Sequence, residues 1–175
     1  RTTQPSLKSR SVAVPRTLKV PLLKHKVVAD ALKTFTFDLT AQQVEAATRY
    51  AGIVKSAKFA RMKETAVRPL FCQEVLAAFL GYTQINPEGS HSLAFELPIG
   101  RGAVDVALGR FGADDGSDET VAPFELKGPG TKDLDAIMPG RGRSPVQQAW
   151  DYANDVPGCK WVLVSNCLEI RLYGF

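Results

Sequence analysis

The sequence predicts a mixed β-sheet flanked by α-helices, an α/β (α+β) fold with helices in its N-terminal part. Two helical patterns lie between residues 40 and 80. Strand-like alternation follows at 102–108 and 121–127, and a helical pattern at 144–154 precedes two apolar runs. Helices and strands in this order are typical of a mixed sheet covered by helices.

Composition sets the first limits. The chain has 175 residues, 45% of them hydrophobic and 23% charged, which is typical of one soluble globular domain. It has no apolar run long enough for a bilayer and no signal-peptide pattern. The three cysteines and two histidines are too few and too scattered for a disulfide framework or a zinc site. We therefore expect a cytoplasmic protein with no membrane partner.

Residues 1–37 are predicted to form a basic N-terminal arm and lead-in. Residues 1–33 hold eight Lys or Arg side chains and one acid, Asp30, and the whole chain carries a formal charge of +4. Prolines within 1–23 indicate an extended or disordered segment, whereas the apolar segment 27–37 has no clear type. The arm is equally consistent with an anionic partner and with a solvated tail.

Two helices are predicted next. The first begins at Thr40, which forms a capping box with Gln43, and extends to about residue 60. Its apolar positions at helical spacing are Val44, Ala47, Ala51, Val54 and Ala57. The second spans 62–80, with Cys72 buried, and we expect a kink or restart at Pro69. Gly81 is a natural left-handed cap for this helix.

Three strands follow, at 92–97, 102–108 and 121–127, and an acidic turn at 112–119 joins the last two. In the third strand apolar and charged residues face opposite sides: Phe124 and Leu126, then Glu125 and Lys127. An antiparallel hairpin of the last two strands would bring Asp105 and Glu125 onto one face.

The charged pair of the third strand suits a divalent-cation site. The carboxylate of Glu125 supplies a hard oxygen ligand, and Lys127 two residues later steadies an anion or an attacking water. On its own, the triplet Glu-Leu-Lys is more commonly a plain surface ion pair, so its meaning depends on the rest of the chain.

The C-terminal third begins with a long loop, 128–143, that has four glycines, two prolines and several basic residues. Ser144 and Gln147 form a second capping box, and Pro145 occupies the favoured first helical position. The helix that follows places Gln148 and Tyr152 one turn apart.

Two final strands, 160–164 and 167–173, are predicted to form a hairpin across Ser165-Asn166. Cys167 would begin the second of these strands. Because the chain starts without methionine and ends on an apolar strand-like run, we expect it to be a fragment of a longer polypeptide.

The ordered set of Asp105, Glu125-Leu-Lys127 and Gln148-x-x-x-Tyr152 resembles the PD-(D/E)xK phosphodiesterase superfamily, which has the restriction-endonuclease-like fold, and the Q-x-x-x-Y helix of RecB-like nucleases. Val104 stands where the family motif often has proline.

Longer segments are similar to the N-terminal nuclease domain of type IIG restriction-modification enzymes, in which one polypeptide carries endonuclease, adenine methyltransferase and DNA-recognition regions. They include Phe124-Glu-Leu-Lys-Gly-Pro-Gly-Thr131, Ser144-Pro-Val-Gln-Gln-Ala149, Trp161-Val-Leu-Val-Ser-Asn166 and Ile170-Arg-Leu-Tyr173. The resemblance identifies residues 38–175 as a nuclease domain.

The resemblance implies a DNA endonuclease that depends on Mg²⁺, with Mn²⁺ as a substitute. Asp105, Glu125 and the backbone carbonyl of Leu126 would hold the metal, and Lys127 would orient or help to deprotonate the water. Glu64, in the context Lys63-Glu-Thr65, would join the site through a water. Glu74 is the alternative helix acid, and either one is otherwise a solvated helix residue.

The resemblance also implies DNA contacts. Gln148 would contact the nucleotide or position the site, with Tyr152 packed beneath it. The alternative for both is an ordinary amphipathic helix, and a structural role explains Tyr152 at least as well. Lys132, Arg141 and Arg143 would contact phosphates, unless they serve only solubility.

The implied partners are double-stranded DNA, the methyltransferase and target-recognition regions of the same longer polypeptide, and a second copy for double-strand cleavage. A methyltransferase signature and a P-loop are both absent from the sequence. Three alternatives stay open: a repair or recombination nuclease of the same fold, a catalytically inactive nuclease-like DNA-binding module, and an interaction scaffold that uses the basic arm.

Overall fold

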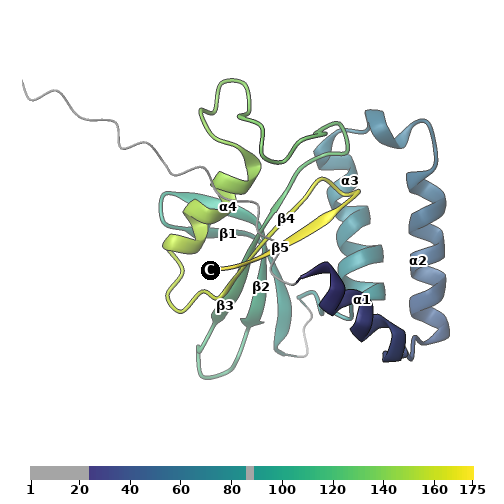
Figure 1. The fold of residues 1–175 in the computed structure, drawn as a ribbon. Helices are drawn as coiled ribbons and strands as arrows, with labels where there is room; N and C mark the ends of the chain where they lie inside the picture. The colour runs from purple at the N-terminus through teal and green to yellow at the C-terminus, as the bar shows by residue number, and fades with distance from the viewer. Residues whose placement is uncertain (1–23, 86–88) are drawn as a thin grey trace, which may run out of the picture. The chain divides into compact units, whose positions relative to one another are not determined.

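The computed structural model describes residues 24–85 and 89–175 (Figure 1). The chain divides into two compact units, Arg1–Thr36 and Phe37–Phe175. The described part of the first unit contains α1 (His25–Thr34), so the apolar segment of undecided type is helical. In α1, Asp30 pairs with Lys33 one turn later at 2.9 Å. The predicted extended arm, 1–23, lies outside the described residues.

The second unit is built on a five-stranded mixed sheet whose strands lie side by side in sequence order. The strands are β1 (His91–Ile99), β2 (Gly102–Phe111), β3 (Glu119–Leu126), β4 (Trp161–Ser165) and β5 (Ile170–Gly174). Neighbouring strands are antiparallel except β3 and β4, which are parallel and are joined by a crossover through α4 (Pro145–Asn154). A mixed sheet with flanking helices confirms the predicted α+β class.

Helices lie on both faces of this sheet (Figure 1). The α-helix α3 (Glu64–Phe71) continues into the π-helix η2 (Cys72–Phe79), and together they cover one face. The helix α2 (Ala41–Val54) packs against η2, while α4 covers the opposite face against β3 and β4.

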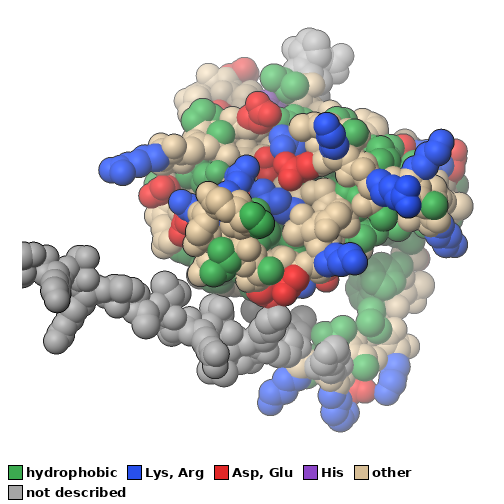
Figure 2. Space-filling model, turned by 90° about the horizontal axis from the view of Figure 1, so that it is seen from above, with side chains coloured by type: hydrophobic (Ala, Val, Ile, Leu, Met, Phe, Trp, Pro, Cys, Tyr) green, Lys and Arg blue, Asp and Glu red, His purple; other side chains and the backbone are tan. Residues whose placement is uncertain are grey.

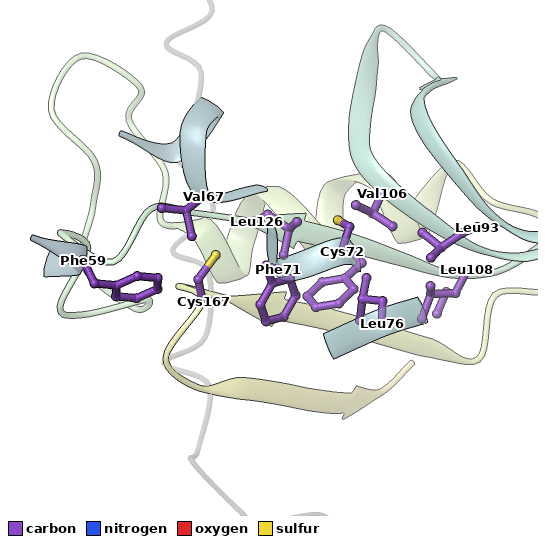
Figure 3. Packing of buried hydrophobic residues seen from close by; sticks show 12 residues of the cluster. Phe59, Val67, Phe71, Cys72, Leu76, Leu93, Val106, Leu108, Leu126 and Cys167 are labelled. Carbon is purple, nitrogen blue, oxygen red and sulfur yellow. The ribbon is translucent and has the colours of Figure 1, made fainter. Parts of the chain in front are cut away.

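One apolar cluster fills the space between α3, η2 and the sheet (Figure 3). Phe71 of α3 and Phe124 of β3 meet edge to face, with ring centroids 6.1 Å apart. The buried members are Phe59, Val67, Phe71, Cys72, Leu76, Leu93, Val106, Leu108, Ala122, Phe124, Leu126 and Cys167. Burying such side chains contributes about 1.5–3 kcal/mol each, so this cluster fixes α3 on the sheet.

A second cluster lies under α4. Ala149 and Ala153 of α4 are fully buried against a cluster that includes Val162 and Val164 of β4. Alanine side chains let a helix lie close to a sheet, because little volume separates the two backbones. Leu134 of the long loop is also fully buried in this cluster.

The first helix differs from the prediction. α2 ends at Val54, and a short 3₁₀ helix η1 (Phe59–Arg61) follows. The side of α2 that faces the protein interior contains Ala46 and Tyr50, whereas Val44 of the same helix is 49% exposed. The Tyr50 ring packs edge-on between Phe59 and Phe71 at 6.1 and 5.9 Å, and these tertiary contacts set how the helix is rotated.

The second helix is not one regular element. It begins at Glu64, and its hydrogen bonding changes from α to π at Cys72, three residues after Pro69. Proline lacks the N–H that would continue the α-helical ladder, so a change near this residue agrees with the expected disturbance. The left-handed cap is confirmed, because Gly81 has φ +80°.

The C-terminal hairpin is confirmed, but its turn is wider than predicted. Cys167 does not begin β5; it lies in the turn with φ +65°. Its N–H donates to the Ser165 hydroxyl at 2.9 Å, and Asn166 Oδ1 accepts the N–H groups of Leu168 and Glu169 at 3.0 Å. These side-chain bonds replace ladder bonds in the turn.

A membrane-spanning helix is not found in the described parts of the chain.

Candidate active site

The hairpin of β2 and β3 brings the two predicted carboxylates side by side. Val106 pairs with Phe124, so the next register position places Asp105 opposite Glu125. The N–H of Leu126 donates to Asp105 Oδ2 at 3.0 Å, which fixes the Asp105 side chain against β3. Two acids opposite each other on adjacent strands share one face of the sheet.

Glu125 and Lys127 form a buried pair. Lys127 Nζ donates to Glu125 Oε1, and the exposed fractions of the two side chains are only 9% and 1%. The Lys127 N–H donates to the Ser165 carbonyl at 2.8 Å, so β4 holds the end of β3 in place. The second oxygen of Glu125, Oε2, is buried and has no hydrogen-bond partner among the described residues. An unsatisfied carboxylate oxygen in such a place is costly, and a cation would relieve it.

Both carboxyl groups resist ionisation. Burial, with the nearby charge of Asp105 as the second cause, raises the pKa of Glu125 to about 7, although Lys127 opposes the shift. Burial also raises the pKa of Asp105, although the Leu126 N–H and Arg68 oppose the rise. Like charges close together in a dry site disfavour simultaneous ionisation. Arg68 and Lys127 therefore do not fully compensate the charges of the two carboxylates.

Glu64, in the first turn of α3, is a third acid near the site, and Arg68 links it to Asp105. Arg68 Nη2 lies 3.1 Å from Glu64 Oε1 and 2.9 Å from Asp105 Oδ1. A Cβ on Gly128 would lie 3.1 Å from the backbone nitrogen of Glu64, so glycine after Lys127 lets β3 approach the start of α3. Glu64 is thus linked to Asp105 by one shared guanidinium.

The alternative helix acid lies in other surroundings. Glu74 of η2 pairs with Arg49 of α2 at 3.1 Å and lines a separate hollow between α2 and the turn after β4. The geometry therefore favours Glu64 over Glu74 as the helix acid of the site.

Gln148 and Tyr152 line a pocket of about 420 Å³. Gln148 Nε2 donates to the Tyr152 hydroxyl at 3.4 Å, while Gln148 Oε1 is buried without a partner in the described structure. Asp105, Glu125 and Lys127 are not among the residues that line this pocket. The Q-x-x-x-Y pair therefore lines a pocket of its own, separate from the charged cluster.

Three arginines among the described residues line the same pocket. Arg141 and Arg143 from the long loop line it, as does Arg101 from the turn between β1 and β2. Arg143 Nη1 pairs with Asp151 of α4 at 2.6 Å. Lys132, the third predicted basic residue, is exposed but does not line this pocket.

The long loop is anchored to the body of the unit. Its Leu134 is fully buried, and the Leu134 carbonyl accepts the N–H of Val146 at 3.2 Å. The Thr131 carbonyl accepts from Asn166 Nδ2 at 2.9 Å, which ties the loop to the β4–β5 turn. These bonds hold the loop beside the site although it contains neither helix nor strand.

Sequence reasoning missed three charged residues of this region: Arg68, Glu96 and Arg101. Arg68 lies four residues after Glu64, a spacing that predicts a helical ion pair but does not reveal the contact with Asp105. Glu96 Oε1 lies 3.5 Å from Arg68 Nη1. The positions of Glu96 and Arg101 depend on the geometry of the turn between β1 and β2. The glycine at position 100 could have indicated this turn from the sequence, and in the structure Gly100 has φ +56°.

The charges of the cluster suit a divalent cation. Four acids and two bases give a net charge of −2 when all are ionised: Glu64, Glu96, Asp105 and Glu125, with Arg68 and Lys127. The described residues contain no ready group of three or more His, Cys, Asp or Glu ligands for a metal. Asp105, Glu125 and the Leu126 carbonyl would thus form a sparse donor set, which suits Mg²⁺ because this ion keeps several waters. Figure 2 shows acidic side chains near the middle of one face of this unit, with Lys or Arg side chains beside them.

Comparisons with protein-family models, with curated proteins and with solved structures find no match for this chain.

Proposed function

We propose that this chain is a Mg²⁺-dependent endonuclease that hydrolyses DNA phosphodiester bonds. The observation that carries the proposal is the row of half-buried Asp105 with buried Glu125 and Lys127, in which two carboxylates have raised pKa values and one carboxylate oxygen has no hydrogen-bond partner among the described residues. Carboxyl groups whose pKa is raised by burial and by a neighbouring charge are common in catalytic sites, which supports this proposal.

The finer fold assignment is part of the same proposal. The β2–β3 hairpin contains Asp105 and the Glu125-Leu-Lys127 triplet. The crossover helix α4, which contains Gln148 and Tyr152, connects β3 to the parallel strand β4. This arrangement supports a restriction-endonuclease-like fold, as the sequence motifs imply.

Asp105, Glu125 and the backbone carbonyl of Leu126 would hold Mg²⁺, which Mn²⁺ would replace. When bound, the ion would polarise the scissile phosphate and make a water a stronger nucleophile. The protein supplies the hard oxygen ligands for it. The N–H of Leu126 keeps Asp105 oriented toward β3 at 3.0 Å.

Lys127 has two tasks in this proposal. Its ammonium group would orient the attacking water and, by its positive charge, make the loss of the water's proton to solvent easier, and the same charge would stabilise the negative charge that develops on the phosphate oxygens. Its contact with Glu125 keeps the ammonium at the buried end of β3. Glu64 would reach the site through a water.

The arginine-lined pocket would hold the DNA backbone beside the reacting bond. Arg101, Arg141 and Arg143 offer planar donors that match phosphate oxygens, and Gln148 offers an unsatisfied acceptor for a donor group on the nucleotide. Lys132 would contact a more distant phosphate. Such contacts position a nuclease without reading sequence.

The proposed partners are double-stranded DNA and the methyltransferase and target-recognition regions of a longer restriction-modification polypeptide in the cytoplasm. One catalytic set cuts one strand, so we expect a nick from one copy and dimerisation for a double-strand break.

The second candidate is a catalytically inactive DNA-binding module. One observation favours it: Arg68 contacts Asp105 at 2.9 Å, where a cation would otherwise compensate the carboxylate. A repair or recombination nuclease of the same fold would share the site and differ in its partners.

The test is nicking of supercoiled plasmid with Mg²⁺ or Mn²⁺ by the wild type, Glu125→Ala and Lys127→Ala. Glu119→Ala, which removes an exposed acid of the same strand, is the matched control. We expect metal-dependent nicking in the wild type and the control, and a loss of about a thousandfold or more in both site variants. Equal cutting by all four proteins removes the catalytic assignment. DNA binding without cutting in any metal makes the binding module the better interpretation.

A further inference from the structure

Arg68 is the most connected side chain of the charged cluster. Its guanidinium lies within 3.5 Å of three carboxylates, those of Glu64, Asp105 and Glu96. Its Nε is buried and has no hydrogen-bond partner in the described part of the chain. Arg68 therefore compensates three negative charges of the cluster at once.

Arg68 lies where it opposes a bound cation. Asp105 Oδ1 contacts Arg68 and Asp105 Oδ2 accepts from Leu126, so both oxygens of this proposed ligand are already engaged. A divalent cation on Asp105 would lie beside a fixed positive charge, and the two would repel each other strongly at such a short distance. The same guanidinium also holds Glu64, whose Oε1 lies 3.1 Å from Arg68 Nη2.

The structure offers this arginine a second position. A hollow of about 600 Å³ opens beside it, lined among others by Arg68, Gln84, Phe95 and Glu96. The Glu96 side chain is 79% exposed and its Oε1 lies 3.5 Å from Arg68 Nη1, longer than the other two contacts. Glu96 also has φ +49°, an uncommon backbone conformation for a residue other than glycine. It follows Phe95, the partner of Val106, so it lies at the register position opposite Asp105.

We propose that Arg68 is a positioning residue that controls metal entry. In the absence of a divalent cation it compensates Asp105 and Glu64, and on metal binding it moves into the hollow to pair with Glu96. Its departure frees an oxygen of Asp105 and releases Glu64 toward the site. This inference rests on the proposed function, because it requires a metal at Asp105 and Glu125.

The experiment measures Mn²⁺ affinity without DNA, from the electron paramagnetic resonance signal of free Mn²⁺, at pH 8.5, where the carboxylates are ionised. We expect Arg68→Met to bind Mn²⁺ about tenfold more tightly than the wild type, because the competing charge is gone. Arg110→Met removes an exposed arginine that pairs with Glu119 and should leave the affinity unchanged. Unchanged or weaker binding by a folded Arg68→Met variant overturns the inference.

Glu96→Gln provides an independent arm, because an exposed side chain can be replaced without unfolding the protein. We expect it to weaken Mn²⁺ binding about threefold, since the displaced Arg68 loses its acceptor. In the double variant Arg68→Met/Glu96→Gln the second change should have no effect on Arg68→Met. If Glu96→Gln weakens binding equally in both backgrounds, Glu96 acts directly on the metal and the exchange is wrong.

Asp105→Asn separates this inference from the proposed function. If the wild type binds Mn²⁺ and Asp105→Asn does not, the site is real and the Arg68 variants decide the inference alone. If Asp105→Asn binds as the wild type does, or if no variant binds Mn²⁺, the proposed metal site and the inference both fail.

Discussion

The hairpin of β2 and β3 carries acidic residues at both of its ends, and the two ends differ in every physical respect. At the turn, Asp115 and Asp118 are exposed and accept hydrogen bonds from nearby backbone N–H groups. Toward the other end, Asp105 and Glu125 are withdrawn from water, and one of their oxygens has no partner in the described structure. The pKa of Asp115 is lowered by its bonds from Ser117, whereas burial raises the pKa of Glu125.

This difference teaches that residue type alone does not mark the candidate site. The turn is acidic as well, but water and backbone donors satisfy its carboxylates. At the site, the sheet and α3 have removed the water that would stabilise the charges of Asp105 and Glu125. The capacity to bind a cation therefore depends on burial together with the register that places the two acids opposite each other.

The largest expected effect is the difference in the free energy of unfolding between breaking the buried ion pair at one end of the hairpin and breaking the exposed ion pair at the other end. Lys127→Met leaves Glu125 buried without its cation and should cost about 3–5 kcal/mol of the free energy of unfolding at pH 8. Arg110→Met breaks the pair with Glu119, whose side chains are 79% and 54% exposed, and should cost at most about 1 kcal/mol. Urea denaturation of both variants measures the contrast. Similar losses would mean that the buried pair is no more important for stability than the exposed one.

The second effect is in the pH dependence of stability. The pKa of Glu125 is raised from 4.5 to about 7, so the folded state binds more protons than the unfolded state in this range. Without metal, the contribution of Glu125 is therefore present below pH 4.5 and is lost as the pH rises to 7, by roughly 3 kcal/mol. Glu125→Gln should remove this decline in unfolding free energy, as measured by urea denaturation at several pH values.

Asp115→Asn is the matched control for the pH experiment. The lowered pKa of Asp115 stabilises the fold above its unfolded pKa, and that contribution is lost as the pH falls. The two substitutions should therefore change the pH profile in opposite directions. A profile that Glu125→Gln leaves unaltered contradicts the burial argument.

A smaller effect is expected for DNA affinity. Arg101→Ala and Arg141→Ala should each weaken binding to duplex DNA by about tenfold and reduce the salt dependence by about one phosphate contact. Arg110→Ala, at the turn end of the hairpin, should change neither quantity. Fluorescence anisotropy at several salt concentrations in Ca²⁺ would measure both. An equal loss in Arg110→Ala would show that the arginine-lined pocket has no special role.

The smallest effect belongs to the turn itself. Asp118 Oδ1 accepts the N–H of Gly112 at 2.8 Å in an exposed position. Asp118→Ala should cost only about 0.5–1 kcal/mol of the free energy of unfolding, because water replaces the lost acceptor. Thermal unfolding measures the cost, and plasmid nicking should be unchanged. Reduced nicking would place this end of the hairpin in the function as well.

The sequence predicted those parts of the fold that depend on neighbouring residues. Both capping boxes, at Thr40 and Ser144, have the full set of reciprocal hydrogen bonds. The rotation of α2 and the turn at Cys167 were not predictable, because they depend on contacts between distant residues. One such contact is the bond from the Tyr50 hydroxyl to the Cys167 carbonyl at 2.7 Å. No local pattern contains this information.

The candidate site divides in the same way. Strand alternation and an expected hairpin were enough to predict that Asp105 and Glu125 share one face, because the side-chain period of a strand is two, whereas the register that places them opposite each other came from the structure. The role of Arg68 required the packing of α3 on the sheet, which brings its guanidinium to Asp105. The arginine pocket required three separate segments, the β1–β2 turn, the long loop and α4, to meet.

The parallel pairing of β3 with β4 has a consequence for how the molecule folds. The β2–β3 hairpin closes a short loop, whereas β4 can join only after a crossover of more than thirty residues has been ordered. Contacts with such long sequence separation form slowly. We therefore expect Asp105 and Glu125 to come together early in refolding, before β4 receives the Lys127 N–H. The pairing of β4 with β3, which completes the hydrogen bond from the Lys127 N–H to the Ser165 carbonyl, would then be the slower step.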